Sequence, residues 1–102
     1  MMLLTKANRN ALPALNATDG DKNAKAVVKF FTPDANFTFY ASEFDGKDTF
    51  FGLIDNSREK ELGYFSLKEL TAVRGKMGLP VERDRYFSPT PLAELGSKVH
   101  AS

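Results

Sequence analysis

Residues 25–65 alternate short runs of aromatic and β-branched side chains with tight turns, and this pattern constrains the fold more than any other feature. Such side chains favour strands, and the Pro, Asp, Asn and Gly residues between the runs favour turns. The predicted strands cover residues 26–32, 37–44, 49–55 and 61–65. Because a parallel connection needs about a dozen residues or more, strands joined by shorter loops are antiparallel neighbours. We therefore predict a four-stranded antiparallel meander.

A helix start follows the last predicted strand. Ser66 and Glu69, three positions later, match the pattern of a capping box. Apolar residues then recur at helical spacing as far as Val73, so we predict a central helix that packs on one face of the sheet. Gly75 or Gly78 is predicted to end this helix, because glycine readily adopts the left-handed conformation of a C-cap.

Shorter helices are predicted near the two ends of the chain. Thr5 can cap a helix that ends before Pro13, and the prolines within residues 88–95 are typical of the first turn of another helix. The fold class predicted is therefore α+β, with a four-stranded antiparallel β-meander packed with a central helix and short terminal helices.

One domain, residues 1–102, is expected from the length. Folding of a chain this long removes roughly two thirds of its unfolded surface from water, which is enough for one hydrophobic core. Residues 16–24 lack large apolar side chains and are rich in turn formers, so they predict a mobile surface loop. Residues 1–2 and 97–102 are predicted to be frayed ends.

Composition excludes several classes of protein. Cysteine is absent, which excludes disulfides, thiol nucleophiles and cysteine zinc sites. No apolar run approaches the roughly 20 residues that cross a bilayer, and no secretory signal pattern is present, so a cytoplasmic protein without membrane contact is expected. The net charge of +1 combines +3 in residues 1–29, −4 in residues 30–69 and +2 in residues 70–102. This layout lacks the uniform positive charge of a sequence-independent DNA binder.

Three carboxylates, those of Glu43, Asp45 and Asp48, lie at the tip of the central predicted hairpin, in the stretch EFDGKDTFFG. If Asp45 and Gly46 form a two-residue turn, Glu43 lies opposite Asp48. Like charges in opposed positions destabilise a sheet, so this register predicts either a cation between the two carboxylates or a longer loop that separates them.

Three explanations for this acidic cluster remain open. We favour an arginine, Arg83 or Arg85, because a guanidinium can bridge two carboxylates through its forked donors. The second is a longer hairpin loop with solvated acids. The third is a divalent metal held by Glu43, Asp45 and Asp48, since hard cations prefer oxygen ligands, although one short loop seldom supplies enough of them. We predict no metal site and keep these three residues as the alternative ligands.

The two-residue turn also places Tyr40 opposite Phe51, on the face away from the central helix. Exposed rings near Lys47 would resemble a stacking platform for single-stranded nucleic acid. Rings covered by the chain after residue 81 would form a second core layer, which we favour because that segment brings further apolar side chains. The candidate residues for partner binding are Tyr40, Phe51, Lys47, Arg83 and Arg85.

Catalytic chemistry has little support in the sequence. The only histidine, His100, lies in the predicted C-terminal tail, with no carboxylate placed near it by a recognisable spacing. Neither GxGxxG nor GxxxxGK[ST] occurs. We predict no catalytic residues and no cofactor.

Three ordered strings, KFFTPDANFTFYASEFDGKDTFFGLI, ELGYFSLKEL and GLPVERDRYFSPTPLAEL, are similar to the bacterial domain of unknown function 2958 family, and the resemblance extends over about residues 3–95. It implies no established catalytic residues. It does imply a genetic setting: plasmids, phages and integrative elements, near genes for conjugation, antirestriction and single-strand DNA binding.

Three functional hypotheses follow. The leading one is a non-enzymatic accessory protein of a bacterial mobile genetic element that binds a protein or nucleic-acid partner and counters host defence. A second is a small metal-dependent enzyme that acts on phosphodiesters, with Glu43, Asp45 and Asp48 as ligands. A third is a single-strand nucleic-acid binding module that uses Tyr40 and Phe51.

Overall fold

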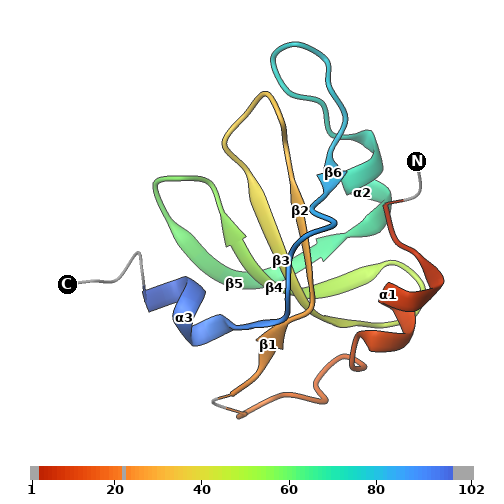
Figure 1. Ribbon diagram of the computed structural model, residues 1–102, viewed down its shortest axis with the longest axis vertical. Coiled ribbons are helices and arrows are strands. Elements are labelled where there is room, and N and C mark those ends of the chain that lie inside the picture. Colours follow the sequence, from red (N-terminus) through yellow and green to blue (C-terminus); the bar gives the residue numbers. More distant parts are fainter. Residues whose placement is uncertain (1–2, 22, 98–102) are drawn as a thin grey trace.

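The structure is a computed structural model that describes residues 3–21 and 23–97 (Figure 1). It has an α+β fold in which antiparallel strands form a five-stranded sheet of order β5-β4-β3-β2-β6 and a two-stranded sheet of β1 and β7. The helices are α1 (Lys6–Ala11), α2 (Leu67–Ala72) and α3 (Leu92–Ser97). The strands are β1 (Lys25–Ala26), β2 (Val28–Phe31), β3 (Thr38–Phe44), β4 (Thr49–Asp55), β5 (Lys60–Ser66), β6 (Glu82–Arg83) and β7 (Thr90–Pro91).

The predicted antiparallel meander is confirmed as β2 to β5, but the predicted number of strands is wrong. β6 adds a fifth strand, because Arg83 pairs with Phe30 and Glu82 pairs with Phe31 along the free edge of β2. The predicted first strand is also divided. Residues 25–26 leave the main sheet and pair with β7 instead, so the C-terminal segment lies beside the start of the strand region.

The N-terminal helix is confirmed by its cap. The Thr5 hydroxyl accepts a hydrogen bond from the backbone amide of Asn8, at 3.1 Å, and the Asn8 side chain accepts one from the backbone amide of Thr5, at 3.0 Å. This reciprocal pair satisfies two amides that have no partner inside the helix. The helix itself buries no residue, but Leu4 and Leu12 on either side of it are buried in the core.

The predicted central helix is short. Ser66 does cap α2 by accepting a hydrogen bond from the amide of Glu69, and Leu70 is buried. However, the helix ends at Ala72 with an extended Val73, rather than at Gly75 or Gly78. A six-residue helix at the end of β5 therefore replaces the longer predicted helix.

A protruding loop, residues 74–80, explains the early end of α2 (top of Figure 1). The Asp34 carboxylate accepts hydrogen bonds from the amides of Met77, at 2.6 Å, and Leu79, at 3.3 Å, which draws the loop towards the β2–β3 connection. A Cβ at Gly75 would lie 1.6 Å from an Asp34 oxygen, so a larger residue there would require the Asp34 side chain to move. These two residues fix the loop in place of a further helical turn.

The C-terminal helix begins later than predicted. Residues 90–91 form β7, and α3 begins at Leu92, directly after Pro91. Because proline fixes its own backbone angle and lacks an amide proton, it is compatible with a helix start at this point. The predicted frayed ends lie outside the described residues except for Ser97, the last residue of α3, and His100 also lies outside them.

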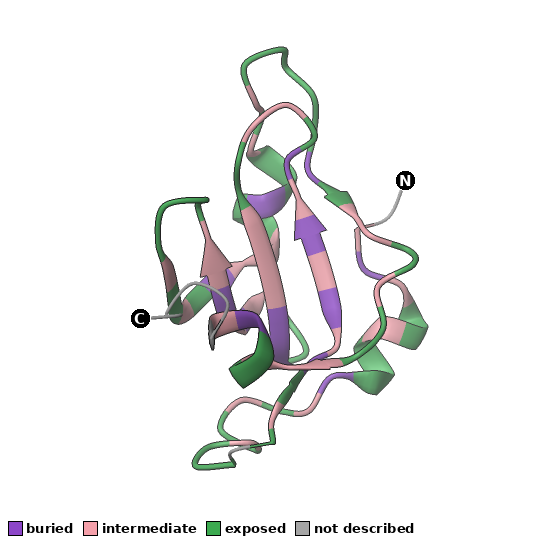
Figure 2. Cartoon of the chain, turned by 60° about the vertical axis from the view of Figure 1, so that its left-hand side comes forward, coloured by how far each residue is buried: buried purple, intermediate pink, exposed green. Residues whose placement is uncertain are grey.

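Two hydrophobic clusters lie on opposite faces of the main sheet. The larger cluster contains Phe30, Phe44, Phe50, Phe65 and Leu70, with Leu4 and Val81 from outside the strands. Its aromatic rings contact one another closely: the Phe44 and Phe50 centroids are 4.5 Å apart and the Phe50 and Phe65 centroids 5.2 Å apart. Buried residues concentrate on the strands and next to the helices, whereas most connections are exposed (Figure 2).

The smaller cluster covers part of the other face. It contains Ala26, Leu53 and Leu95, with Tyr40, Phe87 and Leu92 packed against it. The segment after β6 therefore crosses this face and brings α3 onto β4. No helix within the described part of the chain has the length and apolar character needed to span a membrane.

Candidate functional site

A β-bulge at Ser42 corrects the register predicted for the central hairpin. Ala41 pairs with Gly52, but Glu43 pairs with Phe51, so β3 has one extra residue at this point. Because the turn between β3 and β4 is also longer than predicted, Tyr40 lies opposite Leu53 rather than Phe51. Since side chains alternate between the two faces, the extra residue moves Glu43 out of the large core and onto the opposite face.

The hairpin turn is longer than the predicted Asp45-Gly46 turn. The Asp45 carboxylate accepts hydrogen bonds from the backbone amides of Lys47 and Asp48, both at 2.8 Å, and Thr49, at 3.0 Å. These amides, Lys47 first, lower the pKa of Asp45. The two carboxylates predicted to oppose each other, Glu43 and Asp48, are therefore separated by a longer loop, but their oxygens bind protein donors rather than solvent alone.

Glu43 is buried, with 3% of its surface exposed, and holds the loop before β1. Its carboxylate accepts hydrogen bonds from the amides of Asn16, at 2.8 Å, and Thr18, at 2.9 Å, and from the Thr18 hydroxyl. Burial alone would raise the pKa of Glu43, but these hydrogen bonds, that of the Thr18 hydroxyl first, together lower it. Glu43 is thus an ionised anchor for part of the predicted loop 16–24.

Asp48 joins the hairpin to α2. Its side chain accepts hydrogen bonds from the Ser66 hydroxyl, at 2.6 Å, and from the Lys68 amide, at 2.8 Å, while its backbone oxygen accepts one from Leu67, at 2.8 Å. The Ser66 hydroxyl and the Lys68 amide lower the pKa of Asp48. The Asp48 side chain therefore stabilises the start of α2.

The favoured prediction, an arginine that bridges Glu43 and Asp48, is wrong. Backbone amides and hydroxyl groups donate hydrogen bonds to these two carboxylates instead. Arg83 donates instead to the backbone oxygen of Leu3, at 2.8 Å, and Arg85 is exposed near Tyr86. The three acids of the hairpin bind separate donors, and the described residues contain no group of three His, Cys, Asp or Glu side chains that could hold a metal ion.

The two candidate aromatic residues have different surroundings. The Tyr40 ring lies 5.9 Å from the Phe87 ring, inside the smaller cluster, and the ammonium of Lys29 lies 5.9 Å from the Tyr40 centroid. Burial raises the pKa of Tyr40, and the charges of Asp55 and Asp84 add to this effect. The C-terminal segment thus covers Tyr40, as favoured from the sequence, but it leaves Phe51 beside an open cavity.

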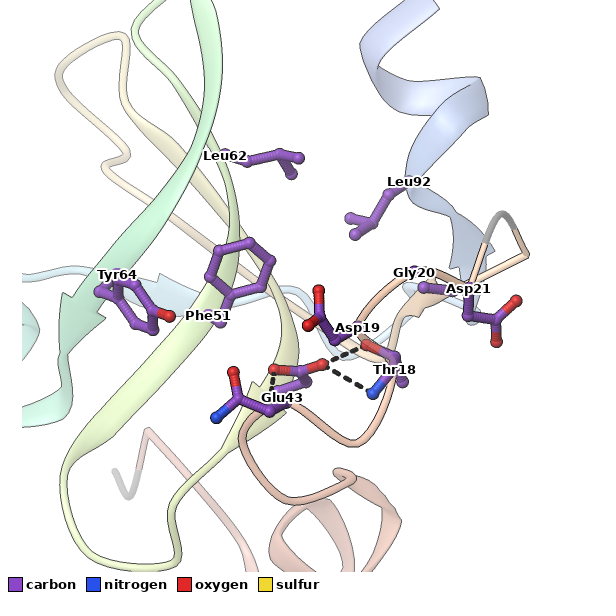
Figure 3. Close-up of a pocket in the computed structure, with 11 residues that line it drawn as sticks. Thr18, Asp19, Gly20, Asp21, Glu43, Phe51, Leu62, Tyr64 and Leu92 are labelled. Atoms are coloured by element: carbon purple, nitrogen blue, oxygen red, sulfur yellow. Dashed lines mark hydrogen bonds between the residues drawn. The ribbon is translucent and has the colours of Figure 1, made fainter.

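This cavity, which we call the Phe51 pocket, has a volume of about 460 Å³. Figure 3 shows Phe51, Leu62 and Tyr64 of β4 and β5 on one side, with the loop before β1 and Leu92 of α3 facing them. Eleven of the residues that the structure describes line it: Asn16, Thr18, Asp19, Gly20, Asp21, Ala24, Glu43, Phe51, Leu62, Tyr64 and Leu92. Of the predicted site residues, it brings together Phe51 and Glu43, whereas Tyr40, Asp45, Lys47, Asp48, Arg83 and Arg85 lie outside it.

Leu62 and Tyr64 are the site residues that sequence reasoning missed. These two residues are 58% and 62% exposed, and the Tyr64 ring lies 5.1 Å from the Phe51 ring. β5 has one neighbouring strand, β4, so its other edge pairs with no strand of the described chain. The alternation of Leu62, Tyr64 and their neighbours along a terminal strand was the signal that could have identified this exposed face.

Among the described residues that line the Phe51 pocket, those with charged side chains are all acidic: Asp19, Asp21 and Glu43. Figure 3 shows the Asp19 carboxylate turned towards the space between Phe51 and Leu92, and the Asp21 carboxylate turned away from it. Glu43 lies at the base of the pocket with its oxygens bound by Asn16 and Thr18. The arrangement is an aromatic and aliphatic surface beside a negative rim.

No curated protein and no solved structure matches the chain. A family model described as a protein of unknown function matches residues 3–98, nearly the full length of the chain, and so confirms the resemblance seen in the sequence. The chain therefore belongs to the DUF2958 family.

Proposed function

We propose that this protein is a non-enzymatic accessory protein of a bacterial mobile genetic element that acts by binding a protein partner through the Phe51 pocket and the edge of β5. The main support is the exposure of Leu62 and Tyr64 beside each other on one face of an edge strand. Exposed apolar side chains of this kind are typical of interaction surfaces, and an unpaired strand edge can accept a strand from a partner. A host defence protein is the first partner to test.

The charge of the pocket favours a protein partner over nucleic acid. The acidic side chains of Asp19, Asp21 and Glu43 would repel phosphates, and Tyr40 is packed against Phe87 instead of being free to stack on a base. The hypothesis of a metal-dependent phosphodiesterase required Glu43, Asp45 and Asp48 to converge on one metal ion. Because each of these carboxylates binds different protein donors, we do not favour it.

A pull-down from host lysate tests the proposal, with Leu62→Lys as the variant and Leu79→Lys as the matched control. Both leucines are exposed, at 58% and 42%, but Leu79 lies on the protruding loop away from the pocket. We expect the wild type and Leu79→Lys to capture the same protein and Leu62→Lys to lose it. Absence of a specific partner, equal capture by all three proteins, or clear binding of labelled oligonucleotides at low salt would contradict the proposal.

A further inference from the structure

We propose that the Phe51 pocket is a receptor for a cationic side chain, arginine in preference to lysine, carried by an extended segment of the partner that pairs with β5. This inference rests on the proposed function and specifies the chemistry of its partner. Aromatic rings, a negative rim, a cavity of suitable size and an available strand edge support it, and each of them restricts the ligand in a different way.

The aromatic wall provides a surface for a cation. The rings of Phe51 and Tyr64 are tilted at 60° with centroids 5.1 Å apart, and Tyr64 is 62% exposed. A cation is attracted to the electron-rich face of such rings, and a planar guanidinium can also stack on them. The aliphatic part of an arginine side chain would contact Leu62 and Leu92, which also line the cavity.

The negative rim provides the complementary charge. Asp19 is exposed and its carboxylate is turned towards the cavity, so it can accept hydrogen bonds directly from a guanidinium (Figure 3). Glu43 already accepts three hydrogen bonds from Asn16 and Thr18, so it acts through its charge and by holding the Asp19 loop in position. Among the described side chains that line the pocket, no lysine or arginine competes for these carboxylates.

The nearest cation on β5 is engaged elsewhere. The Lys60 ammonium donates to the backbone oxygen of Leu95, at 2.9 Å, and lies 3.9 Å from the Asp55 carboxylate. It therefore does not neutralise the rim. The cavity volume of about 460 Å³ falls within the roughly 300–1,000 Å³ typical of small-ligand sites and leaves room for one long side chain.

The strand edge explains how the cation would be delivered. Alternate side chains of a strand point to the same face, so a segment paired with the edge of β5 places every second side chain on the face that carries Leu62 and Tyr64. Backbone hydrogen bonds to β5 would position the segment, and one cationic side chain would enter the pocket. The preferred partner sequence is thus an extended segment with an arginine flanked at alternate positions by apolar residues.

Synthetic peptides test this inference on the full chain. The probe is the acetylated and amidated peptide TVTRTVT, which has the length of β5 and carries its arginine and two valines on one face. Its control replaces arginine with citrulline, which has nearly the same shape but no charge. We expect the arginine peptide to bind about tenfold more tightly, as measured by amide shifts of Gly20, Phe51 and Tyr64 in an NMR titration. A lysine version should bind with intermediate affinity.

Two aspartates provide a matched pair of variants. Asp19→Asn should remove most of the preference for arginine over citrulline, whereas Asp21→Asn, on the same loop but turned away from the cavity, should keep it. Equal affinity for the two peptides, or an equal effect of the two substitutions, would overturn the inference. A partner lost by Leu62→Lys but retained by Asp19→Asn would leave the proposed function intact and exclude the cation receptor, so the two proposals can fail separately.

Discussion

At the scale of single residues, Glu43 has the most unusual environment among the acids of the central hairpin. It is a buried carboxylate that is satisfied by amides and a hydroxyl, without any basic side chain among these donors. Burial of a charge is unfavourable unless hydrogen bonds replace its hydration, and three donors serve that purpose here. The same bonds connect the loop at Asn16 and Thr18 to β3, so one side chain stabilises the fold and shapes the Phe51 pocket.

Glu43→Gln should lower the free energy of unfolding by about 1–3 kcal/mol near pH 7, because an amide group leaves at least one donor of Asn16 or Thr18 without its acceptor. The folded-state pKa of Glu43 is lowered, so the stabilisation by the carboxylate is present above the unfolded-state pKa, about 4.3, and is lost as the pH falls through the lower folded-state value. Urea unfolding between pH 7 and pH 3 should show the difference from wild type shrinking at the acid end.

The control for this experiment is Glu61→Gln, the same change at an exposed position of β5. Its unfolding free energy should stay within about 0.5 kcal/mol of the wild-type value at each pH. If the effect of Glu43→Gln were as large at pH 3 as at pH 7, the ionised carboxylate would not be the source of the stabilisation.

At the scale of elements, the pairing of β3 with β4 depends on Gly52. A Cβ at this position would lie 1.8 Å from the backbone oxygen of Tyr40 and 3.1 Å from the Cα of Ala41, directly before the bulge. Because the obstruction is backbone in the middle of a sheet, it cannot be relieved by rotating a side chain. Gly63, the partner of Gly52 on β5, has more space, since its Cβ would lie 3.6 Å from the nearest atom, in the Ile54 side chain.

Gly52→Ala should therefore lower the free energy of unfolding by about 3 kcal/mol or more, and Gly63→Ala should change it by less than about 1 kcal/mol in either direction. Thermal unfolding of the two variants measures the difference. Similar midpoints for both would contradict the close approach of β3 to β4 at Gly52.

The sequence predicted the meander but not the bulge, and the reason is physical. Short turns restrict neighbouring strands to antiparallel pairing, which is local information. The bulge at Ser42 and the pairing of β6 with β2 depend on contacts between distant segments; for example, Thr18 and Glu43 are 25 positions apart. The longer turn could have been predicted from the sequence, because an aspartate at the start of a turn commonly accepts hydrogen bonds from the amides that follow it, as Asp45 does.

The candidate site was only partly predictable for the same reason. Phe51 was correctly placed on the face away from the larger cluster, but the two-residue turn gave it the wrong neighbour, Tyr40. Residues 16–24 were predicted only as a mobile surface loop, because no local sequence pattern indicates that the Thr18 amide donates a hydrogen bond to Glu43. The pocket arises from this distant contact and from the position of α3.

At the scale of the whole molecule, the two faces of the sheet have different roles. The face with Phe30, Phe50 and Phe65 is closed by the segments around α1 and α2. On the other face, α3 and Phe87 cover part of β3 and β4, whereas the Phe51 pocket and the edge of β5 stay open. A small domain needs most of its large apolar side chains in the core, so those left exposed at this edge are available for a partner.

Paired aromatic truncations on the two faces test this division. Phe50 has no exposed surface and contacts other rings of the larger cluster, so Phe50→Ala should lower the free energy of unfolding by about 3–5 kcal/mol. Tyr64 is 62% exposed, so Tyr64→Ala should lower it by less than about 1 kcal/mol while weakening capture of the partner. Denaturant unfolding measures the first effect and the pull-down the second. If Tyr64→Ala destabilised the protein as strongly as Phe50→Ala, the Tyr64 ring would belong to the core, and the outer face of β5 would contribute to folding instead of providing a surface for binding.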